Sequence, residues 1–475
     1  MIKKSALSII FLFATVIHAQ NNSNDSVGVL SIKDLFYQIE NYHPLYQIAN
    51  IQELYGTVNR SRAIGKFEPN LSFETREKKF DGKSYYNQSY FELESNTPTP
   101  ISFTAGIEKN SGTYLNNESY TPIDGLGYAG LQIPLLKNLI TDQRRTLLKQ
   151  SKNIIEQSIF QKKSMVQNLY LDIWKGYINW YINHKQTESL QKALELSNQR
   201  LEAIKKVFLA GGCSGFDTLE ISVQQQQFNA RLIDNEILTL KSKILLNTHL
   251  WTISDKKEIL PLMFKPQIKP TNSYFEFLDP LVIGSDIQKS LQNQPELMVT
   301  QRKLDNIGLD LKLKRNYLLP KLDLKYQYLN TGFQSFPSAG NNSRFGIAFA
   351  SPLFFIGARA DYKEAQYKFL ETQMSLKFKQ RELEQKLDAL TQQIKTYRQI
   401  YMMLRQVEMG YFQLYQMEIQ KFNSGEGTVF LLNSREARYW EANLKTIEHY
   451  GKFLNIMVEF LALNGTIHQF NEAIH

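Results

Sequence analysis

The residues that could do chemistry in this 475-residue chain are few, and they are widely separated. A catalytic or metal site needs a second base or ligand at a suitable spacing, and the sequence shows no Ser/His/Asp, Cys/His or metal-ligand pattern. Four of the seven histidines each stand alone within a helical pattern: His43, His184, His249 and His449. We therefore expect these histidines to pack or to lie at the surface, and we expect no enzyme activity, cofactor or metal site.

Sulfur-containing and aromatic side chains give no stronger sign of a reactive site. The single cysteine, Cys213, is flanked by glycine and Ser214, so no neighbouring base or second ligand would use its thiolate. Met402 and Met403 have the thioethers that soft metal ions prefer, yet they adjoin Leu404 in a heptad pattern, which favours core packing. A mid-helix cluster predicts an aromatic layer between the helical hairpins: Trp174, Tyr177, Trp180 and Tyr181.

Over longer distances, the chain repeats one set of sequence landmarks, and the second copy begins about half the chain length after the first. Each half has an X-Pro helix start, a Pro at the entry to a strand, a Pro at a strand-to-helix step, and an aromatic-x-x-Gly turn. In order, these landmarks are Pro44, Pro69, Pro134 and Gly211 in the first half, and Pro295, Pro320, Pro352 and Gly425 in the second. Matched landmarks in the same order indicate a duplicated unit.

The first residues and the charge place the chain in a broad class. Residues 1–19 have the layout of a secretory signal peptide, with Lys3 and Lys4, an apolar run and a permissive cleavage site. The run is too short to span a bilayer, and no cysteine lies near the cleavage site, so we expect an exported chain without a lipid anchor. The net charge is +9 with interspersed signs, which is typical of a solvated surface and not of a nucleic-acid interface.

We divide the mature chain into two repeats. The first, 20–283, contains a helix from Ser31 to about Gly65, strands in 69–135, a helical hairpin in 136–251 and a Pro-rich crossover in 252–283. The second, 284–475, contains a helix, strands in 320–353, a helical hairpin in 354–463 and a tail.

Both repeats contain segments in which apolar and polar residues alternate. In the second repeat Leu322, Leu324 and Tyr326 alternate with Asp323 and Lys325, which indicates a strand with one apolar face. A soluble sandwich could produce this alternation, and a lipid-facing barrel strand requires it, so the alternation alone favours neither. The polar segments 81–89 and 109–124 are predicted to be loops.

The helical tracts are too long for an ordinary globular core. Leu383, Leu387, Leu390 and Ile394 follow the alternating four and three spacing of a coiled-coil seam. Each tract holds about 70 residues, which corresponds to on the order of 100 Å of helix. A second helical tract follows each glycine turn, so we expect two antiparallel helical hairpins.

This combination resembles the TolC-like outer-membrane efflux protein family, the outer membrane factors, over nearly the whole mature length. The resemblance rests on the X-Pro helix starts, the glycine turns and the strand/helix junctions at Pro69, Pro134, Pro320 and Pro352. It implies a mixed fold in which a homotrimer forms one transmembrane β-barrel and a long periplasmic α-helical coiled-coil barrel.

The resemblance also implies a function and a location. Such a protein is the outer-membrane channel of a tripartite efflux or type I secretion system in a Gram-negative bacterium, with a large periplasmic portion. It conducts substrates passively, and its partners are a periplasmic adaptor protein, an inner-membrane transporter and outer-membrane lipid. The segment 90–110 exceeds the family plan of two strands per half, so it either adds a hairpin or lengthens the first strand.

By the same resemblance the glycine turns are the periplasmic tips and the adaptor contact: Gly211, Gly212, Gly215, Gly425 and Gly427. Many members close the aperture with acidic residues just after the second turn, where this chain has Leu431 and Ser434. The first half keeps an acid at the equivalent position, Asp217. A ring of Asp217 would favour cations and Leu431 would make an apolar constriction, while the structural alternative for Asp217 is an N-cap of the returning helix.

Two other functions compete with the channel. A surface-displayed structural or adhesive coiled-coil protein would explain the helices, but it would not need alternating strands in both halves. A secreted enzyme should bring polar groups together at one place, and the sequence gives no sign of this.

Overall fold

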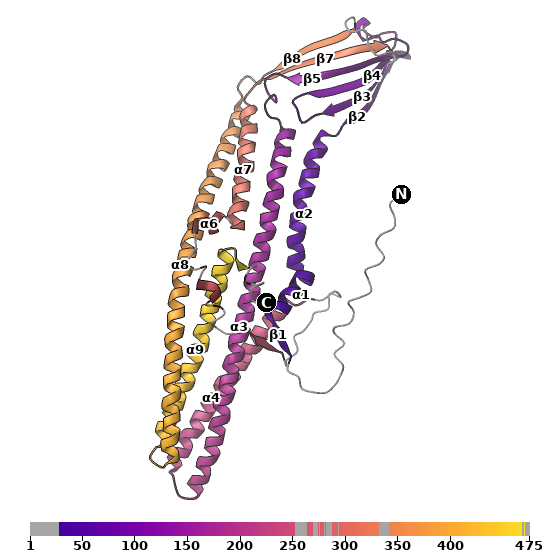
Figure 1. The fold of residues 1–475 in the computed structure, drawn as a ribbon. Coiled ribbons are helices and arrows are strands. Elements are labelled where there is room, and N and C mark those ends of the chain that lie inside the picture. The colour runs from indigo at the N-terminus through magenta and orange to yellow at the C-terminus, as the bar shows by residue number, and fades with distance from the viewer. Residues whose placement is uncertain are drawn as a thin grey trace.

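The protein is an elongated molecule with a β-sheet at one end and two helical hairpin tips at the other (Figure 1). The computed structural model describes residues 28–251, 264–268, 274, 276–279, 281, 287–292, 294–331, 342–467 and 470. The predicted signal peptide, 1–19, and most of the predicted crossover, 252–283, lie outside the described residues.

The first helical segment is two helices and not one. α1 (Ile32–Tyr42) starts as predicted at Ser31, whose side chain accepts a hydrogen bond from the Asp34 N–H at 3.3 Å. α2 (Pro44–Ile64) starts after His43, whose backbone is extended. Pro44 has no N–H to continue the hydrogen-bond ladder of α1, yet its fixed φ suits the first position of a new helix. The prediction of one continuous helix from Ser31 was therefore wrong.

The sheet has six antiparallel strands in the order β2-β3-β4-β5-β7-β8. Their bounds are β2 (Asn70–Phe80), β3 (Lys83–Asn96), β4 (Ser102–Ser111), β5 (Leu126–Pro134), β7 (Lys321–Thr331) and β8 (Ser343–Ala350). The predicted loop 81–89 is wrong, because the turn is Asp81-Gly82 alone, with φ of 52° and 66°. Asp-Gly is the pair that a two-residue hairpin favours, since both positions need positive φ. The segment 90–110 thus belongs to an added hairpin, and the first repeat supplies four strands.

The two faces of the sheet differ in chemistry. On one face polar side chains bond across strands: Arg344 to Glu108 at 2.6 Å and Gln132 to Asp323 at 2.9 Å. The opposite face carries exposed apolar side chains: Phe73, Phe91, Phe103, Phe345, Ile347 and Phe349. The period-two pattern therefore gives a sheet with one polar face and one apolar face.

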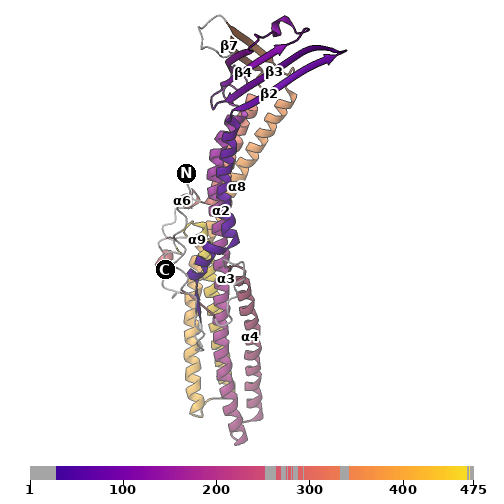
Figure 2. The same ribbon diagram turned by 90° about the vertical axis from the view of Figure 1, so that its right-hand side faces the viewer.

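Two helices run almost the length of the helical region: α3 (Gln143–Leu209) and α8 (Ile356–Asn423), with 67 and 68 residues. Near the sheet they lie beside α2 and α7 (Pro295–Asn316), in the order α2-α3-α7-α8. Toward the tips they lie beside α4 (Gly215–Asn247) and α9 (Val429–Leu463), in the order α4-α3-α9-α8 (Figures 1 and 2). In the described part of the chain, none of these helices has a stretch apolar enough to cross a membrane.

A small second sheet joins distant parts of the chain beside the middle of α3. β1 (Val29–Ser31) pairs in parallel with β6 (Lys265–Gln267), and the short helix α6 (Ile287–Gln292) precedes α7. The Tyr177 hydroxyl accepts the Gln267 N–H at 2.9 Å and lies 2.7 Å from the Leu30 carbonyl oxygen. One side chain of α3 thereby fixes both strands.

The core lies at mid-height, where the short helices of each repeat meet end to end. Trp174, Tyr177 and Trp180 of the predicted aromatic layer are at most 2% exposed, and Tyr181 is partly buried. Trp174 packs on Phe36 of α1 and on Phe470, so the layer lies under these segments and not between the hairpins. The predicted seam of α8 is confirmed, since Leu383, Leu387, Leu390 and Ile394 are buried. The packing predicted for Met402 and Met403 is wrong, because their side chains are 53% and 62% exposed.

Candidate functional site

The two hairpin tips are built from the same backbone turn. After α3, the Gly211 N–H bonds to the Phe208 carbonyl and the Gly212 N–H bonds to the Val207 carbonyl, both at 2.9 Å. After α8, Gly425 and Glu426 repeat this pair of bonds to Phe422 and Lys421, at 3.1 and 2.9 Å. This pair of backbone hydrogen bonds ends a helix whose next residue adopts the left-handed conformation, here Gly211 at φ 77° and Gly425 at φ 82°. The glycines at these positions are therefore required by the turn itself.

The remaining tip glycines sit close to the helix that precedes them. A Cβ on Gly427 would come 2.8 Å from the Phe422 backbone nitrogen, and one on Gly212 would come 2.9 Å from a Val207 methyl. Gly215 is the first residue of α4 and has more room.

The returning helices start with related caps that differ at one residue. Ser214 caps α4 by accepting the Asp217 N–H at 3.3 Å, and the Asp217 carboxylate accepts the Ser214 N–H at 3.0 Å. Thr428 caps α9 by accepting the Leu431 N–H at 3.2 Å. The Leu431 side chain has no acceptor for the Thr428 N–H. Asp217 is thus not the N-cap that was one of its two sequence interpretations, but the third helical residue of a capping box. Leu431 is 38% exposed and Ser434 is half-buried.

The four predicted junction prolines lie where strands meet the helical region. Pro69 and Pro320 directly precede β2 and β7. Pro134 is the last residue of β5, and Pro352 follows β8 by two residues.

Close to the tips, a buried polar cluster joins all four helices, and sequence reasoning missed it. Glu436 of α9 is 0% exposed, and its carboxylate forms an ion pair with Arg200 of α3. It also accepts hydrogen bonds at 3.1 Å from Tyr415 of α8 and from the Gln224 amide of α4. We call Arg200, Gln224, Tyr415 and Glu436 the tip cluster.

The surroundings of Arg200 and Tyr415 raise the pKa of both groups. Burial alone would lower the pKa of Arg200, but the Glu436 carboxylate outweighs burial and raises it. Burial, together with the Glu436 carboxylate, raises the pKa of Tyr415 to about 12, so Tyr415 stays protonated and donates. The cluster therefore holds the two hairpins together with a buried ion pair whose oxygens are satisfied from three helices.

One signal could have revealed the tip cluster. Val429, Leu432, Glu436 and Trp440 follow a seam spacing, and a carboxylate in that row is a polar residue at a core position. The run of four glutamines at 224–227 likewise contains one buried member, Gln224, at 8% exposed.

Two histidines predicted to be isolated lie together. His43 and His249 stack with ring centroids 5.5 Å apart, and His43 Nε2 lies 3.4 Å from His249 Nδ1. The His43 Nδ1 accepts the Leu45 N–H at 3.1 Å and so caps α2. In the described part of the chain, no group of three or more His, Cys, Asp or Glu is placed to hold a metal ion.

The outer edges of the helical region carry apolar seams that no described residue covers. On α4 the exposed residues follow three and four spacing, with Gln226 and Ala230 as the less apolar members: Phe216, Leu219, Val223, Ile233, Ile237, Leu240 and Ile244. On α8 the exposed seam is Met403, Val407, Leu414 and Met417. The buried side of α4 is more polar, since it includes Gln224, Asn235 and Ser242. A coiled-coil seam in water is normally covered by a partner helix.

The fold was compared with known proteins. No protein-family model and no curated protein matches the sequence. Among solved structures, the outer-membrane channel OprN is 13% identical with a TM-score of 0.64, over 91% of this chain and 89% of that one. The CmeC outer membrane channel of Campylobacter jejuni is 12% identical with a TM-score of 0.64, over 93% and 89% of the two chains. The outer membrane protein VceC of Vibrio cholerae is 12% identical with a TM-score of 0.65, over 91% and 96%.

At these identities the similarity is one of fold. The chain has the architecture of outer-membrane channels along nearly its full length, and the resemblance predicted from the sequence is confirmed at that level.

Proposed function

We propose that this protein is a homotrimeric outer-membrane channel that passively conducts substrates from a periplasmic adaptor and an inner-membrane pump to the exterior. The observation that carries the proposal is the pair of uncovered apolar seams on α4 and α8, in a chain that has the fold of outer-membrane channels. The alternative, a surface-displayed coiled-coil protein, would leave the polar and apolar faces of the sheet without a purpose.

The outermost strand and the outermost helices on each side of the chain lie in line along the length of the molecule. One side of the chain is formed by β2, α2 and α4, and the other by β8 and α8. α2 also exposes apolar residues, among them Ile48, Tyr55 and Val58, and the upper part of α8 exposes Tyr367, Met374 and Phe378. Because each side is apolar and the two sides differ, copies would join head to tail, and such contacts close into a ring.

Closure also removes the open edges of the sheet. A strand edge cannot remain open in lipid, so β2 of one copy would pair with β8 of the next. Three copies of the six-stranded sheet supply eighteen strands, a size at which barrels enclose a water-filled channel. The apolar face would meet outer-membrane lipid and the polar face would line the channel, with the helical region in the periplasm.

The tips are the surface we assign to the adaptor. The turns at Gly211 and Gly425 end the two hairpins at the far end from the sheet (Figure 1). Asp217 and Leu431 occupy equivalent positions just after these turns, so a trimer would have three of each near its aperture. The Asp217 carboxylate is already engaged by Ser214, which makes it a structural cap as well as a candidate aperture charge.

The assembly is tested with the purified protein in detergent. We expect a trimer by native mass spectrometry and ion conductance in planar bilayers. Ile237→Glu places a charge in the α4 seam and should abolish both, because a buried unpaired carboxylate is costly. Gln227→Glu places the same charge on an exposed position of α4 outside the seam and should leave both unchanged. A monomeric wild-type protein, or equal behaviour of the two variants, contradicts the proposal.

The adaptor contact is tested by disulfide trapping. The reporter is placed at Glu426 and not at Gly427, because a side chain at Gly427 would meet the Phe422 backbone at 2.8 Å. The single native cysteine is first removed by Cys213→Ser. Glu426→Cys should then cross-link to a cysteine-bearing adaptor from the same cell, and a cysteine at Lys395, remote from the turn, should not.

A further inference from the structure

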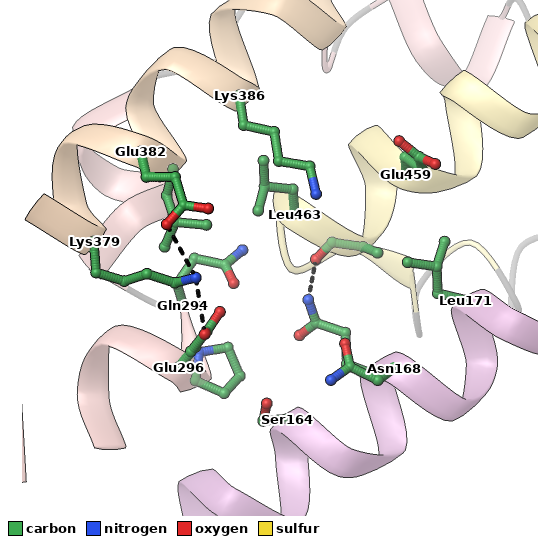
Figure 3. A pocket seen from close by; sticks show the side chains of 14 residues that line it. Ser164, Asn168, Leu171, Gln294, Glu296, Lys379, Glu382, Lys386, Glu459 and Leu463 are labelled. Carbon is green, nitrogen blue, oxygen red and sulfur yellow. Dashed lines mark hydrogen bonds and ion pairs between the residues drawn. The ribbon is translucent and has the colours of Figure 1, made fainter. Parts of the chain in front are cut away.

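The start of α7 meets the end of α9 at mid-height, and the meeting point is hollow. The cavity has a volume of about 120 Å³ and lies between α3, α7, α8 and α9 (Figure 3). Its walls are polar where the two helix ends face each other. On one side, the Gln167 amide closes the cavity by donating to the Ala462 carbonyl at 2.6 Å.

Gln294, at the start of α7, points into this cavity with an amide nitrogen that has no partner. Its side chain is 3% exposed, and its Nε2 is buried without a hydrogen bond. As the N-cap of α7 it makes no side-chain bond to the helix. An unpaired buried amide lowers the stability of the fold by on the order of 1–3 kcal/mol. A ligand that accepts a hydrogen bond from the Gln294 amide would recover this energy.

Positive groups face the same space. Figure 3 shows the Lys386 ammonium and the Gln294 amide pointing toward the middle of the cavity from the neighbouring helices α8 and α7, with Lys386 at its exposed side. The ion pairs around the cavity, among the residues that the structure describes, use Lys379 and Lys175 and leave Lys386 without one. The first-turn N–H groups of α7 also lack intrahelical partners, and the helix dipole makes this end positive.

Each of the three carboxylates of the cavity is paired with a lysine. Lys379 bridges Glu296 at 3.0 Å and Glu382 at 3.3 Å, so one lysine charge serves two carboxylates. Glu459 is bound to Lys175 at 2.5 Å. Among the described residues of the cavity, the donors without a partner are the Gln294 amide, the Lys386 ammonium and the start of α7.

We propose that this cavity binds a small oxyanion, a carboxylate or phosphate group, between Gln294, Lys386 and the N-terminus of α7. The volume accommodates one such group, and charge-assisted hydrogen bonds to it would satisfy the Gln294 amide. The bound oxyanion would tie α7 and α8 together at the level where α9 ends. This inference concerns a single chain and does not depend on the proposed channel function.

The test uses thermal unfolding and calorimetric titration of the full-length protein in detergent, with sodium chloride keeping the ionic strength constant. Inorganic phosphate and acetate are the two probes. We expect saturable stabilisation by at least one of them, with phosphate alone indicating a phosphoryl ligand and acetate a carboxylate. Lys386→Gln should weaken binding about tenfold or more, because it removes the charged donor. Gln294→Glu should abolish binding, because it replaces the donor with a carboxylate.

The matched control is Lys377→Gln, which removes the same charge from α8 outside the cavity. Its affinity for the probe should equal that of the wild type. Circular dichroism and the melting temperature without probe establish that each variant folds. The proposal is overturned if neither probe gives saturable stabilisation, or if Lys386→Gln and Lys377→Gln behave alike.

Discussion

The two repeats build the same joint from different residues. In the first, the start of α2 meets the end of α4, and His43 fills the joint by stacking on His249 and capping α2. In the second, the start of α7 meets the end of α9, and Gln294 neither caps its helix nor fills the joint, which leaves a cavity. In both joints a proline at the first helical position, Pro44 or Pro295, fixes the backbone conformation of the helix start. The residue before the proline can therefore differ between the two repeats.

The tips show the same division between backbone and side chain. Both turns keep the left-handed glycine and a Ser or Thr cap three residues later, at Ser214 and Thr428. Only the first tip adds an acid to complete a capping box, at Asp217. Duplication has therefore conserved the conformational requirements, while chemistry varies at positions that the backbone does not constrain.

The largest effect is expected where the two repeats are tied together. Glu436→Leu removes the partner of the buried Arg200 guanidinium and should destabilise the hairpins by about 3–5 kcal/mol, seen as rapid hydrogen exchange near the tips. Glu441→Gln on the same helix breaks an exposed pair with Lys445 and should cost less than about 0.5 kcal/mol. Similar costs for the two variants would show that the tip cluster does not join the repeats.

The joints should differ in their response to acid. Burial, together with His249, lowers the pKa of His43 from 6.5 to about 4, so the folded protein binds fewer protons than the unfolded chain between these values. Burial also lowers the pKa of His249, against the opposing charge of Asp172. Stability is therefore full above about pH 6.5 and is lost as the pH falls, with His43 accounting for about 2–3 kcal/mol at pH 4.

Denaturant unfolding from pH 7.5 to 4 checks this difference. His43→Asn keeps a capping side chain without the titrating ring, so its stability should fall less steeply with acid. The second joint has Gln294 at the equivalent place, and the neutral substitution Gln294→Asn should leave the pH dependence of stability unchanged. An identical acid response of His43→Asn and wild type would remove the distinction between the joints.

A smaller effect is expected from giving the second joint the cap that it lacks. Gln294→Asn introduces a strong N-capping side chain at the start of α7 and should stabilise the protein by about 1 kcal/mol in chloride buffer. His43→Gln places the residue of the second joint in the first joint and should lower the stability of the protein by about 1 kcal/mol. Melting temperatures of the two variants should move in opposite directions.

The smallest effects are expected at the tips. Asp217→Ala opens the capping box of α4 and should cost about 1 kcal/mol, measured by local hydrogen exchange. Leu431→Asp should create the missing box on α9 and stabilise that helix start by about 0.5 kcal/mol, since Leu431 is partly exposed and loses little packing. If Leu431→Asp destabilises the α9 start, the two tips are not equivalent in structure.

Local and periodic features of the fold were predictable from the sequence. The glycine turns, the coiled-coil seam of α8 and the strand pattern of β7 each depend on neighbouring residues or a short period, and the structure has all three. Two errors were also local: the helix from Ser31 was continued through the helix start at Pro44, and Asp81-Gly82 was not recognised as a hairpin turn. Both carry known sequence signals.

By itself, the sequence determined a duplicated unit of strands, long helices and glycine turns, because each of these follows from backbone geometry and side-chain period. Only the tertiary structure decided which polar groups meet. Arg200 and Glu436 are 236 residues apart and His43 and His249 are 206 apart, so no local pattern pairs them. It likewise decided that the seam of α4 and the methionines of α8 are left uncovered, because burial depends on which helix lies alongside and not on the apolar residues alone.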